Sequence, residues 1–357
     1  MLRSMRVRFA TLLSFTAAIG AGVAHGEQPA APQRTVVDLA GKERHVPAVV
    51  KKTAVLGGVP VVNSYVFVAG DRDTIITGLP NFALTPRWRF QARLAPRLAR
   101  LPAMQDPSGR ANVEALLDAR PDVVLVSGAA AEDSAEQLAQ LGLTPFRMSR
   151  FSAAMHDRDA MDRRIVDGIA RLYGREEQAA AYGRAFEGAE TRLRDGLSGL
   201  TAAERPRVLY FEYDLMRQQH YVPDWWIARA GGVSVTERNR HTELMTLSIE
   251  QIIAWNPDII IVNSRRDIED VRQDTRLKDI SAVRANRIYA IPWGVCGWGY
   301  HTVEHPLTFL WAAKLFHPDR FRSLDLTREL KRFYSEFFAY SLSDGEAAEI
   351  LAGAPEH

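Results

Sequence analysis

Aromatic and basic side chains gather in the parts of this sequence that follow predicted β-strands. The candidate ligand-binding residues are Arg87, Trp88, Tyr213, Trp225, Trp226, Arg240, His241, Trp293, Trp298, Tyr300 and His301. Aromatic rings offer faces to a bulky ligand, and cationic groups donate charge-assisted hydrogen bonds to an anion. The set therefore suits an anionic metal chelate. Core packing is the alternative for each tryptophan, and it is the expectation for Trp255 and Trp311, which occupy apolar positions of predicted helices.

Two histidines, His301 and His305, are spaced to share one face of a helix and to bind a divalent metal there. Pro306 disfavours a helical conformation at His305, so we do not expect a two-histidine helix site. A single histidine, His241 or His301, remains a candidate to complete the coordination of a metal that arrives inside a chelate. We expect no cofactor and no direct metal site of the protein's own.

The sequence lacks the short motifs of several enzyme classes. It contains no Gly-x-Ser-x-Gly nucleophile elbow, no Walker phosphate loop, no Gly-x-Gly-x-x-Gly fingerprint and no carboxylate–histidine metal cluster. A site assembled from distant loops leaves no such motif, so an exported metal-dependent or chelatase-like enzyme stays the alternative. We predict a binding protein rather than an enzyme, and we assign no catalytic residue.

Buried strands must position the candidate binding residues. Short apolar runs bounded by turn residues alternate with helical patterns, which indicates parallel strands in βα units. The runs are residues 54–56, 74–76, 122–126, 208–211, 258–262 and 287–291. Because ligands of open α/β sheets bind beyond the carboxyl ends of the strands, the loops after these runs are the expected binding loops.

An internal repeat indicates two similarly built halves. Residues 112–126 align without gaps on residues 248–262, with four identical positions of fifteen and six more that are aliphatic in both. Each copy opens with a residue that favours the N-cap, Asn112 or Ser248, and continues as a short helix. A Pro-Asp pair then stops the helix before a buried strand. One such unit in each half predicts two lobes.

Helical patterns connect and follow the lobes. A long helix over residues 175–203 would span about 43 Å at 1.5 Å per residue, enough to join two lobes, although Gly183, Gly188, Gly196 and Gly199 weaken it. The predicted organisation is a signal peptide (1–26), an N-terminal lobe (27–174), the interlobe helix (175–203), a C-terminal lobe (204–325) and a C-terminal helical tail (326–357).

The amino terminus is typical of a secretory signal peptide. Arg3, Arg6 and Arg8 precede an uncharged, largely apolar stretch at residues 9–24, and small residues at positions 24 and 26 favour cleavage after Gly26. Sixteen such residues are too few to span a bilayer, and no other apolar run approaches 18 residues. We therefore expect a periplasmic protein that does not span the membrane.

Composition and charge exclude other classes. The 357 residues are 46% hydrophobic and 25% charged, which is ordinary for a globular protein. Removing the three leader arginines from the 45 basic residues leaves 42 against 43 acidic residues, so nucleic acid is not an expected partner. The lone cysteine, Cys296, excludes an intramolecular disulfide and a cysteine-rich metal site.

Several segments together resemble one family. They are residues 36–41 with Val46-Pro47, the glycines at 231–232, both Pro-Asp strand entries, and residues 283–289 and 315–321. In this order, with the leader and the central helix, they are similar to class III periplasmic substrate-binding proteins of ABC importers. That class binds ferric siderophores, vitamin B12 or haem. The resemblance covers most of the chain after the leader.

The resemblance implies a fold, a function and two docking residues. The fold is α/β, with two Rossmann-like lobes around central parallel sheets, one long rigid helix between them and a ligand cleft between the lobes. The expected function is capture of a metal chelate, most of all a ferric siderophore, by a monomer that delivers it to a permease dimer with its ATPase subunits. Nickel chelate, haem, cobalamin and molybdate stay open as ligands.

Glu114 and Glu250, the paired glutamates of the repeat, match the permease-docking glutamates of that class. A carboxylate at the second residue of a helix can meet a cation of the permease without distorting the fold. The alternative is that each glutamate only stabilises its own helix dipole, by about 0.3–1 kcal/mol.

Overall fold

The structure is a computed structural model that describes residues 32–148, 160–218, 221–239 and 244–355. The predicted signal peptide and its cleavage after Gly26 lie outside these ranges. In the ranges that are described, no helix combines the length and the apolar character needed to cross a membrane.

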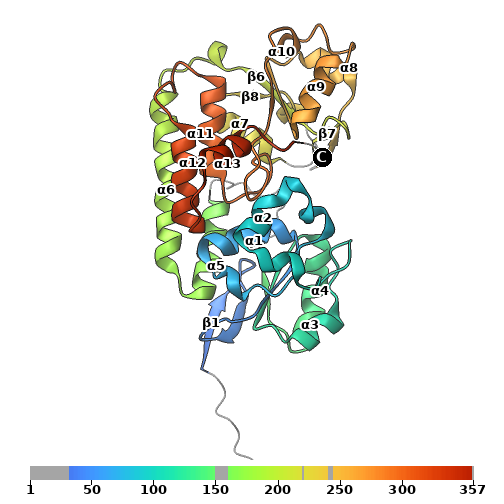
Figure 1. Ribbon diagram of the computed structural model, residues 1–357, viewed down its shortest axis with the longest axis vertical. Helices are drawn as coiled ribbons and strands as arrows, with labels where there is room; N and C mark the ends of the chain where they lie inside the picture. Colours follow the sequence, from blue (N-terminus) through green and yellow to red (C-terminus); the bar gives the residue numbers. More distant parts are fainter. Residues whose placement is uncertain (1–31, 149–159, 219–220, 240–243, 356–357) are drawn as a thin grey trace, which may run out of the picture. The chain divides into compact units, whose positions relative to one another are not determined.

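The first lobe, drawn from blue to green in the lower half of Figure 1, is built on a parallel sheet with the strand order β3-β4-β5. Its strands are β3 (Thr53–Gly57), β4 (Val123–Ser127) and β5 (Pro145–Arg147), and its helices are α1 (Val59–Ala69), α2 (Arg89–Leu94), α3 (Val113–Ala119), α4 (Ala129–Gln140) and α5 (Met161–Tyr173). The apolar run at 74–76 is not a strand, because Asp71 caps a 3₁₀ turn there and only Ile75 bridges to Thr53. β3 and β4 form at the expected runs.

The second lobe repeats this plan around a parallel sheet with the order β11-β10-β6-β8. Its strands are β6 (Arg207–Phe211), β8 (Val233–Ser234), β10 (Ile259–Val262) and β11 (Ile288–Ala290), and β7 (Arg217–Gln218) pairs with β9 (Met245–Thr246) in a small antiparallel ribbon. Its helices are α7 (Val222–Arg229), α8 (Ile249–Trp255), α9 (Arg265–Gln273), α10 (Ser281–Arg284) and α11 (His305–Phe316). The predicted α/β fold with two Rossmann-like lobes is confirmed.

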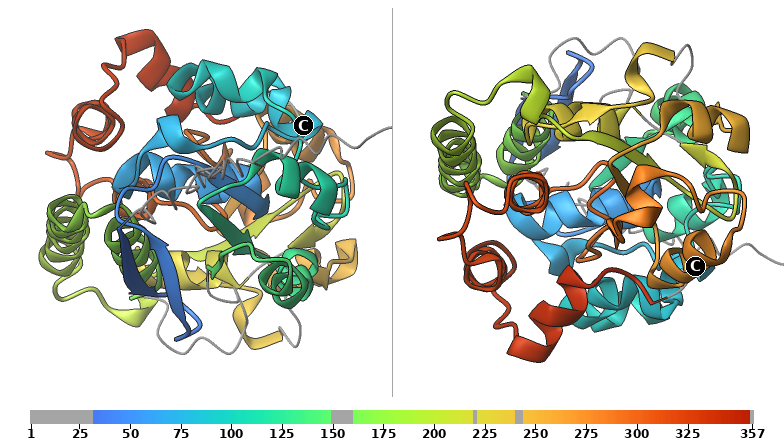
Figure 2. Two further views of the ribbon diagram at one scale, coloured as in Figure 1. Left: turned by 90° about the horizontal axis from the view of Figure 1, so that it is seen from below. Right: turned by 90° about the horizontal axis from the view of Figure 1, so that it is seen from above.

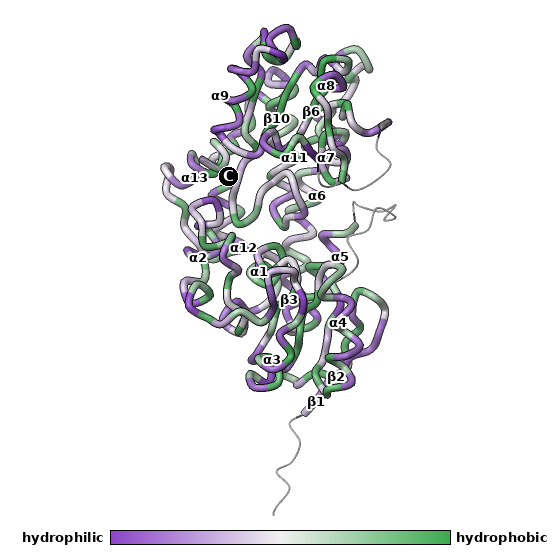
Figure 3. The backbone as a smooth tube through the Cα atoms, turned by 90° about the vertical axis from the view of Figure 1, so that its right-hand side faces the viewer, coloured by the Kyte–Doolittle hydropathy of each residue, from purple (hydrophilic) through white to green (hydrophobic). Residues whose placement is uncertain are grey.

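Successive residues of the central strands face two different cores, as the alternation of side chains along a strand requires. In β4, Val124 faces an outer core under α3 and α4, whereas Leu125 faces an inner core. In β6, Leu209 faces the outer core of the second lobe, whereas Tyr210 faces the same inner core as Leu125. Apolar segments accordingly lie inside each lobe and hydrophilic ones outside (Figure 3). One continuous core therefore ties the lobes together.

The helix–turn–strand repeat folds alike in both lobes. Asn112 caps α3 through the Ala115 N–H, and Ser248 caps α8 in a capping box with Gln251. The C-cap residues that follow the helices, Arg120 and Asn256, both adopt the left-handed conformation, with φ of 48° and 40°, and a Pro-Asp pair follows each. In each pair the aspartate accepts backbone N–H bonds from the neighbouring strand entry. The repeated sequence thus encodes a repeated structure.

The helix that joins the lobes, α6 (Glu176–Gly196), is shorter than predicted. It runs through Gly183 and Gly188 but ends seven residues before position 203, since Gly199 has a φ of +70° and residues 202–204 form a separate 3₁₀ turn. At Gly196 a Cβ atom would lie 2.5 Å from the Phe321 ring, so the end of α6 packs closely on the second lobe. Figure 2 shows α6 beside α11 and α12 on one side of the fold.

The C-terminal tail, α12 (Leu326–Phe338) and α13 (Asp344–Leu351), contacts both lobes. On the first lobe, Arg93 pairs with Glu346 at 2.9 Å and Arg89 with Glu349 at 3.2 Å. On the second lobe, the Trp293 N–H donates to the carbonyl of Ile350 at 3.0 Å. A further backbone bond joins positions 265 and 354. The tail is therefore a second connection between the lobes, beside α6.

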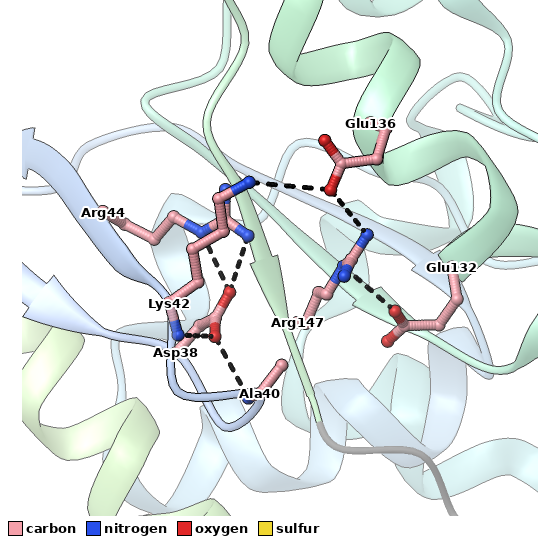
Figure 4. Close-up of polar contacts among 7 residues, drawn as sticks. All are labelled: Asp38, Ala40, Lys42, Arg44, Glu132, Glu136 and Arg147. Atoms are coloured by element: carbon pink, nitrogen blue, oxygen red, sulfur yellow. Dashed lines mark hydrogen bonds and ion pairs between the residues drawn. The ribbon is translucent and has the colours of Figure 1, made fainter.

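An amino-terminal hairpin of β1 (Gln33–Val37) and β2 (Glu43–Pro47) packs on the first lobe through the polar network drawn in Figure 4. The buried Asp38 carboxylate accepts from the Ala40 and Lys42 N–H groups and pairs with Arg44 at 2.7 Å. Nearby, Arg147 of β5 pairs with Glu132 and Glu136 of α4 at 3.2 and 3.1 Å. This network fixes the hairpin turn and has no part in the candidate site.

Candidate functional site

Loops at the carboxyl ends of both sheets meet between the lobes. Arg87 and Trp88 belong to a 3₁₀ turn (Pro86–Trp88) of the first lobe. The Arg87 guanidinium donates to the carbonyl of Asn263, directly after β10, at 3.1 Å, and it lies 4.2 Å from the centre of the Trp293 ring. The Trp88 ring packs edge-on against Trp293 with 5.3 Å between centroids. One arginine and one tryptophan of the first lobe thus contact the second lobe.

A chain of hydrogen bonds runs behind this contact, entirely within the second lobe. The Tyr210 hydroxyl donates to the Asn263 side-chain oxygen at 2.5 Å, and the Asn263 amide donates to the Tyr300 hydroxyl at 2.6 Å. Tyr300 in turn donates to Glu212 at 2.7 Å, and Arg217 donates to the same carboxylate at 2.9 Å. The chain fixes the side-chain amide of Asn263, and the backbone carbonyl of the same residue accepts the hydrogen bond from Arg87.

Burial keeps the hydroxyl groups of this chain protonated. It raises the pKa of Tyr300, and the neighbouring Glu212 carboxylate raises it further. The pKa of Tyr210 is raised well above its usual value, again chiefly by burial. Both hydroxyls are therefore hydrogen-bond donors throughout the physiological pH range.

Two buried donors of the site have no acceptor within the part of the chain that the structure describes. They are Nε of Arg87 and the indole Nε1 of Trp293, whose side chain is 2% exposed. A buried donor without a partner costs on the order of 1–3 kcal/mol. The Arg87 guanidinium places a positive charge where the two lobes meet, which is one of the features that an anion site requires.

The loop that carries Trp293 and Tyr300 is held from several sides. Gln91 of α2 donates to the Val295 carbonyl at 3.1 Å. Glu304 accepts hydrogen bonds from Tyr334 of α12 at 2.8 Å and from the Cys296 N–H at 3.2 Å. Burial raises the pKa of Glu304 to about 7. The loop is thus fixed by the first lobe and by the tail together.

A second buried cluster anchors the end of this loop. His305, the first residue of α11, has one ring nitrogen 3.0 Å from the Tyr300 carbonyl and the other against the Asp162 carboxylate of α5. The Tyr65 hydroxyl of α1 donates to Asp162 at 2.6 Å. His301 lies before the helix, so the two histidines do not form a helix-face metal site. No group of three potential metal ligands occurs among the described ranges.

The candidate ligand-binding residues separate into three groups. The structure brings Arg87, Trp88, Trp293 and Tyr300 together, with His301 next to Tyr300 in sequence. Arg240 and His241 lie outside the described residues. The others pack elsewhere.

Tyr213 and the remaining tryptophans of the candidate set pack against other residues. Tyr213 follows β6 but donates to Asp274 at the end of α9, against the outer core. Trp226 and Trp298 have no exposed surface and pack in the inner core. Trp225 packs edge-on against His305. Trp225 and Trp226 are adjacent in helix α7 and point about 100° apart around its axis, so the sequence alone does not show which ring is accessible.

The sequence placed Glu212 and Asn263 in expected binding loops but did not select either, or Tyr210, as a candidate ligand-binding residue. Asn263 and Glu212 directly follow β10 and β6, and this position is the signal that placed them in the expected binding loops. Tyr210 lies inside a strand and carries no such signal. For Asp162 the sequence signal was weak: the residue is a carboxylate next to Met161, which belongs to the apolar stripe of α5.

The repeat glutamates are exposed, as docking residues must be. Glu114 and Glu250 are each the second residue of their helix, α3 and α8. Hydrogen bonds from its own backbone N–H and from the Ser248 hydroxyl lower the pKa of Glu250, so its carboxylate is ionised at neutral pH. Figure 1 shows α3 and α8 in different lobes, both on the side away from α6.

Comparison with known proteins agrees with this architecture. Residues 87–293 match the periplasmic binding protein family, and the chain belongs to it. It is 24% identical over 274 residues to the molybdate-binding protein MolA of Haemophilus influenzae, which covers 72% of this chain and 78% of MolA. The two lobes and the helix that joins them have the arrangement of class III members, and the chain is accordingly a periplasmic solute-binding protein.

Solved structures support the fold along nearly the whole chain. A periplasmic solute-binding protein of Veillonella parvula is 25% identical with a TM-score of 0.75, covering 89% of this chain and 97% of its own. MolA bound to molybdate is 21% identical with a TM-score of 0.77, covering 87% and 99%. Helicobacter pylori CeuE with Ni(II) bound is 18% identical with a TM-score of 0.69, covering 88% and 98%.

Proposed function

We propose that this protein captures a compact, metal-containing anion of the molybdate class between its lobes and delivers it to the permease of an ABC importer. The observation that carries the proposal is the contact of Arg87 with Asn263 and Trp293 across the lobes, with Nε of Arg87 and Nε1 of Trp293 buried and without an acceptor. An oxyanion supplies acceptors to both groups. The similarity to MolA supports the same ligand class.

A ferric siderophore is the second candidate. The aromatic rings of Trp88, Trp293 and Tyr300, which lie within 5.3 to 6.1 Å of one another in successive pairs, favour it. A chelate of that kind would lie against ring faces and would separate Trp88 from Trp293. Nickel chelates, haem and cobalamin are lesser alternatives, and His301 would then be the candidate ligand to the metal.

Delivery requires export and docking. The signal peptide at residues 1–26 directs the chain to the periplasm, where it acts as a monomer. Glu114 and Glu250 pair with basic groups of the permease dimer, whose ATPase subunits supply the energy. The protein releases its solute unaltered, so it has no catalytic residue.

Titration of the purified protein tests the ligand. Native mass spectrometry with sodium molybdate or a ferric siderophore, and tryptophan fluorescence for affinity, should show one bound molybdate per chain. Loss of a charge-assisted hydrogen bond predicts that Arg87→Ala raises Kd roughly 10- to 100-fold. Arg87→Lys, which keeps the charge but lacks Nε, should bind nearly as weakly, whereas the exposed control Arg110→Ala should bind like wild type.

Tight binding of a ferric siderophore without any binding of molybdate would select the second candidate. An unchanged Kd in Arg87→Ala would contradict the assigned site. A protein that binds neither ligand but hydrolyses a chromogenic ester or phosphate would favour the enzyme alternative.

A further inference from the structure

The repeated helices α3 and α8 share a second exposed feature besides their glutamates. Three residues after Glu114, Leu117 is 41% exposed, and three residues after Glu250, Ile253 is 48% exposed. The two aliphatic residues occupy the same position of the sequence repeat. Residues three apart on a helix are neighbours on one face. Each lobe therefore presents a carboxylate beside an exposed aliphatic side chain.

Packing of the two helices does not explain these aliphatic residues. The preceding residues, Leu116 and Ile252, are fully buried and attach each helix to its lobe. A single exposed leucine on a surface is ordinary. An exposed aliphatic residue at one aligned position of both lobes, next to an acidic residue each time, indicates a shared use of the two surfaces.

The charges of the same surfaces indicate the chemistry of the partner. In the described ranges neither Glu114 nor Glu250 forms an ion pair, and the lowered pKa of Glu250 leaves its carboxylate ionised. A complementary partner has basic groups. Because the two surfaces are alike and belong to different lobes, the partner that fits both presents two equivalent sites, as a symmetric dimer does.

We propose that Leu117 and Ile253 are apolar anchors of the permease interface, each entering a pocket beside the basic group that pairs with Glu114 or Glu250. The inference rests on the proposed function, because it takes the permease dimer as the partner. The two kinds of residue have separate effects. Exposed charges set the rate and orientation of association, whereas desolvated apolar side chains mainly set the rate of dissociation.

Binding kinetics on the permease–ATPase complex in lipid nanodiscs test this division. Leu117→Ser with Ile253→Ser should raise the dissociation rate about tenfold for each anchor, with little dependence on salt. Glu114→Gln with Glu250→Gln should lower the association rate, and only this effect should shrink as salt is added. Val37→Ser with Val233→Ser, at 49% and 42% exposed positions of β1 and β8, is the matched control.

Solute affinity and folding are measured on the same variants. Urea unfolding and the fluorescence titration should be unchanged in the Leu117/Ile253 variant, since both side chains are exposed. If this variant dissociates at the wild-type rate while the glutamate variant is impaired, Leu117 and Ile253 are not anchors, and the docking role of the glutamates is unaffected. A wild-type protein that binds its solute but no permease complex overturns the proposed importer function as well.

Discussion

Replacing Glu304 by glutamine should remove the part of the pH dependence of the free energy of unfolding that arises from the burial of this carboxyl. Burial raises the pKa of Glu304 from 4.5 to about 7, against the hydrogen bonds that Tyr334 and the Cys296 N–H donate. A carboxyl whose pKa is higher in the folded than in the unfolded protein stabilises the fold most below pH 4.5. That contribution is lost as the pH rises through about 7. At ~1.4 kcal/mol per pKa unit, the whole loss is about 3 kcal/mol.

Urea unfolding at pH 5 and pH 8 measures this effect. In Glu304→Gln the amide NH₂ group replaces one of the two acceptor oxygens and faces a donor, either the Tyr334 hydroxyl or the Cys296 N–H, so the variant should be less stable than wild type at pH 5. Between pH 5 and pH 8 the free energy of unfolding of the wild type should fall by about 2.5 kcal/mol relative to that of the variant, because only the wild type carries the buried charge at pH 8. Glu336→Gln, an exposed carboxyl of α12, should follow the wild-type curve. A difference that stays constant between the two pH values would refute the reasoning.

Three further changes have expected outcomes by urea unfolding. Asp162→Ala removes the carboxylate between Tyr65 and His305, and loss of one member of a buried pair should cost about 3–5 kcal/mol and also weaken solute binding. Gly57→Ala should leave most molecules unfolded without urea. The new Cβ would lie 1.5 Å from the Ser127 carbonyl oxygen of β4, and Gly57 has a φ of +87°, which alanine rarely adopts. Asp258→Ala, which frees a strand-entry N–H of β6, should cost only about 1–2 kcal/mol.

Local sequence signals predicted most of the fold. The N-cap residues Asn112 and Ser248 and the Pro-Asp pairs fixed two helix–turn–strand units, since caps and turn chemistry act within a few residues. The extent of α6 was wrong because an apolar stripe continues past Gly199, where the backbone turns. The run at 74–76 has the composition of a strand, but its cap at Asp71 favours a 3₁₀ turn.

The site was only partly predictable. Trp226 and Trp293 are both buried in the inner core, yet Trp293 also contacts Arg87 of the other lobe. That distinction depends on contacts between residues about 200 positions apart, which a single sequence does not encode locally. The Asp162–His305 pair also depends on residues that are distant in sequence, because it forms only when α5 and α11 pack together.

The tail helices have a consequence for how the transporter recognises a loaded protein. Because α13 is bonded to α2 on one lobe and to the Trp293 loop on the other, rotation of the lobes would break Arg93–Glu346 and the backbone bond at Trp293. These contacts, together with α6, therefore favour the interlobe orientation of the structure. We expect empty and loaded forms to present nearly the same spacing between α3 and α8, so the permease would read occupancy from fine changes at the mouth of the site.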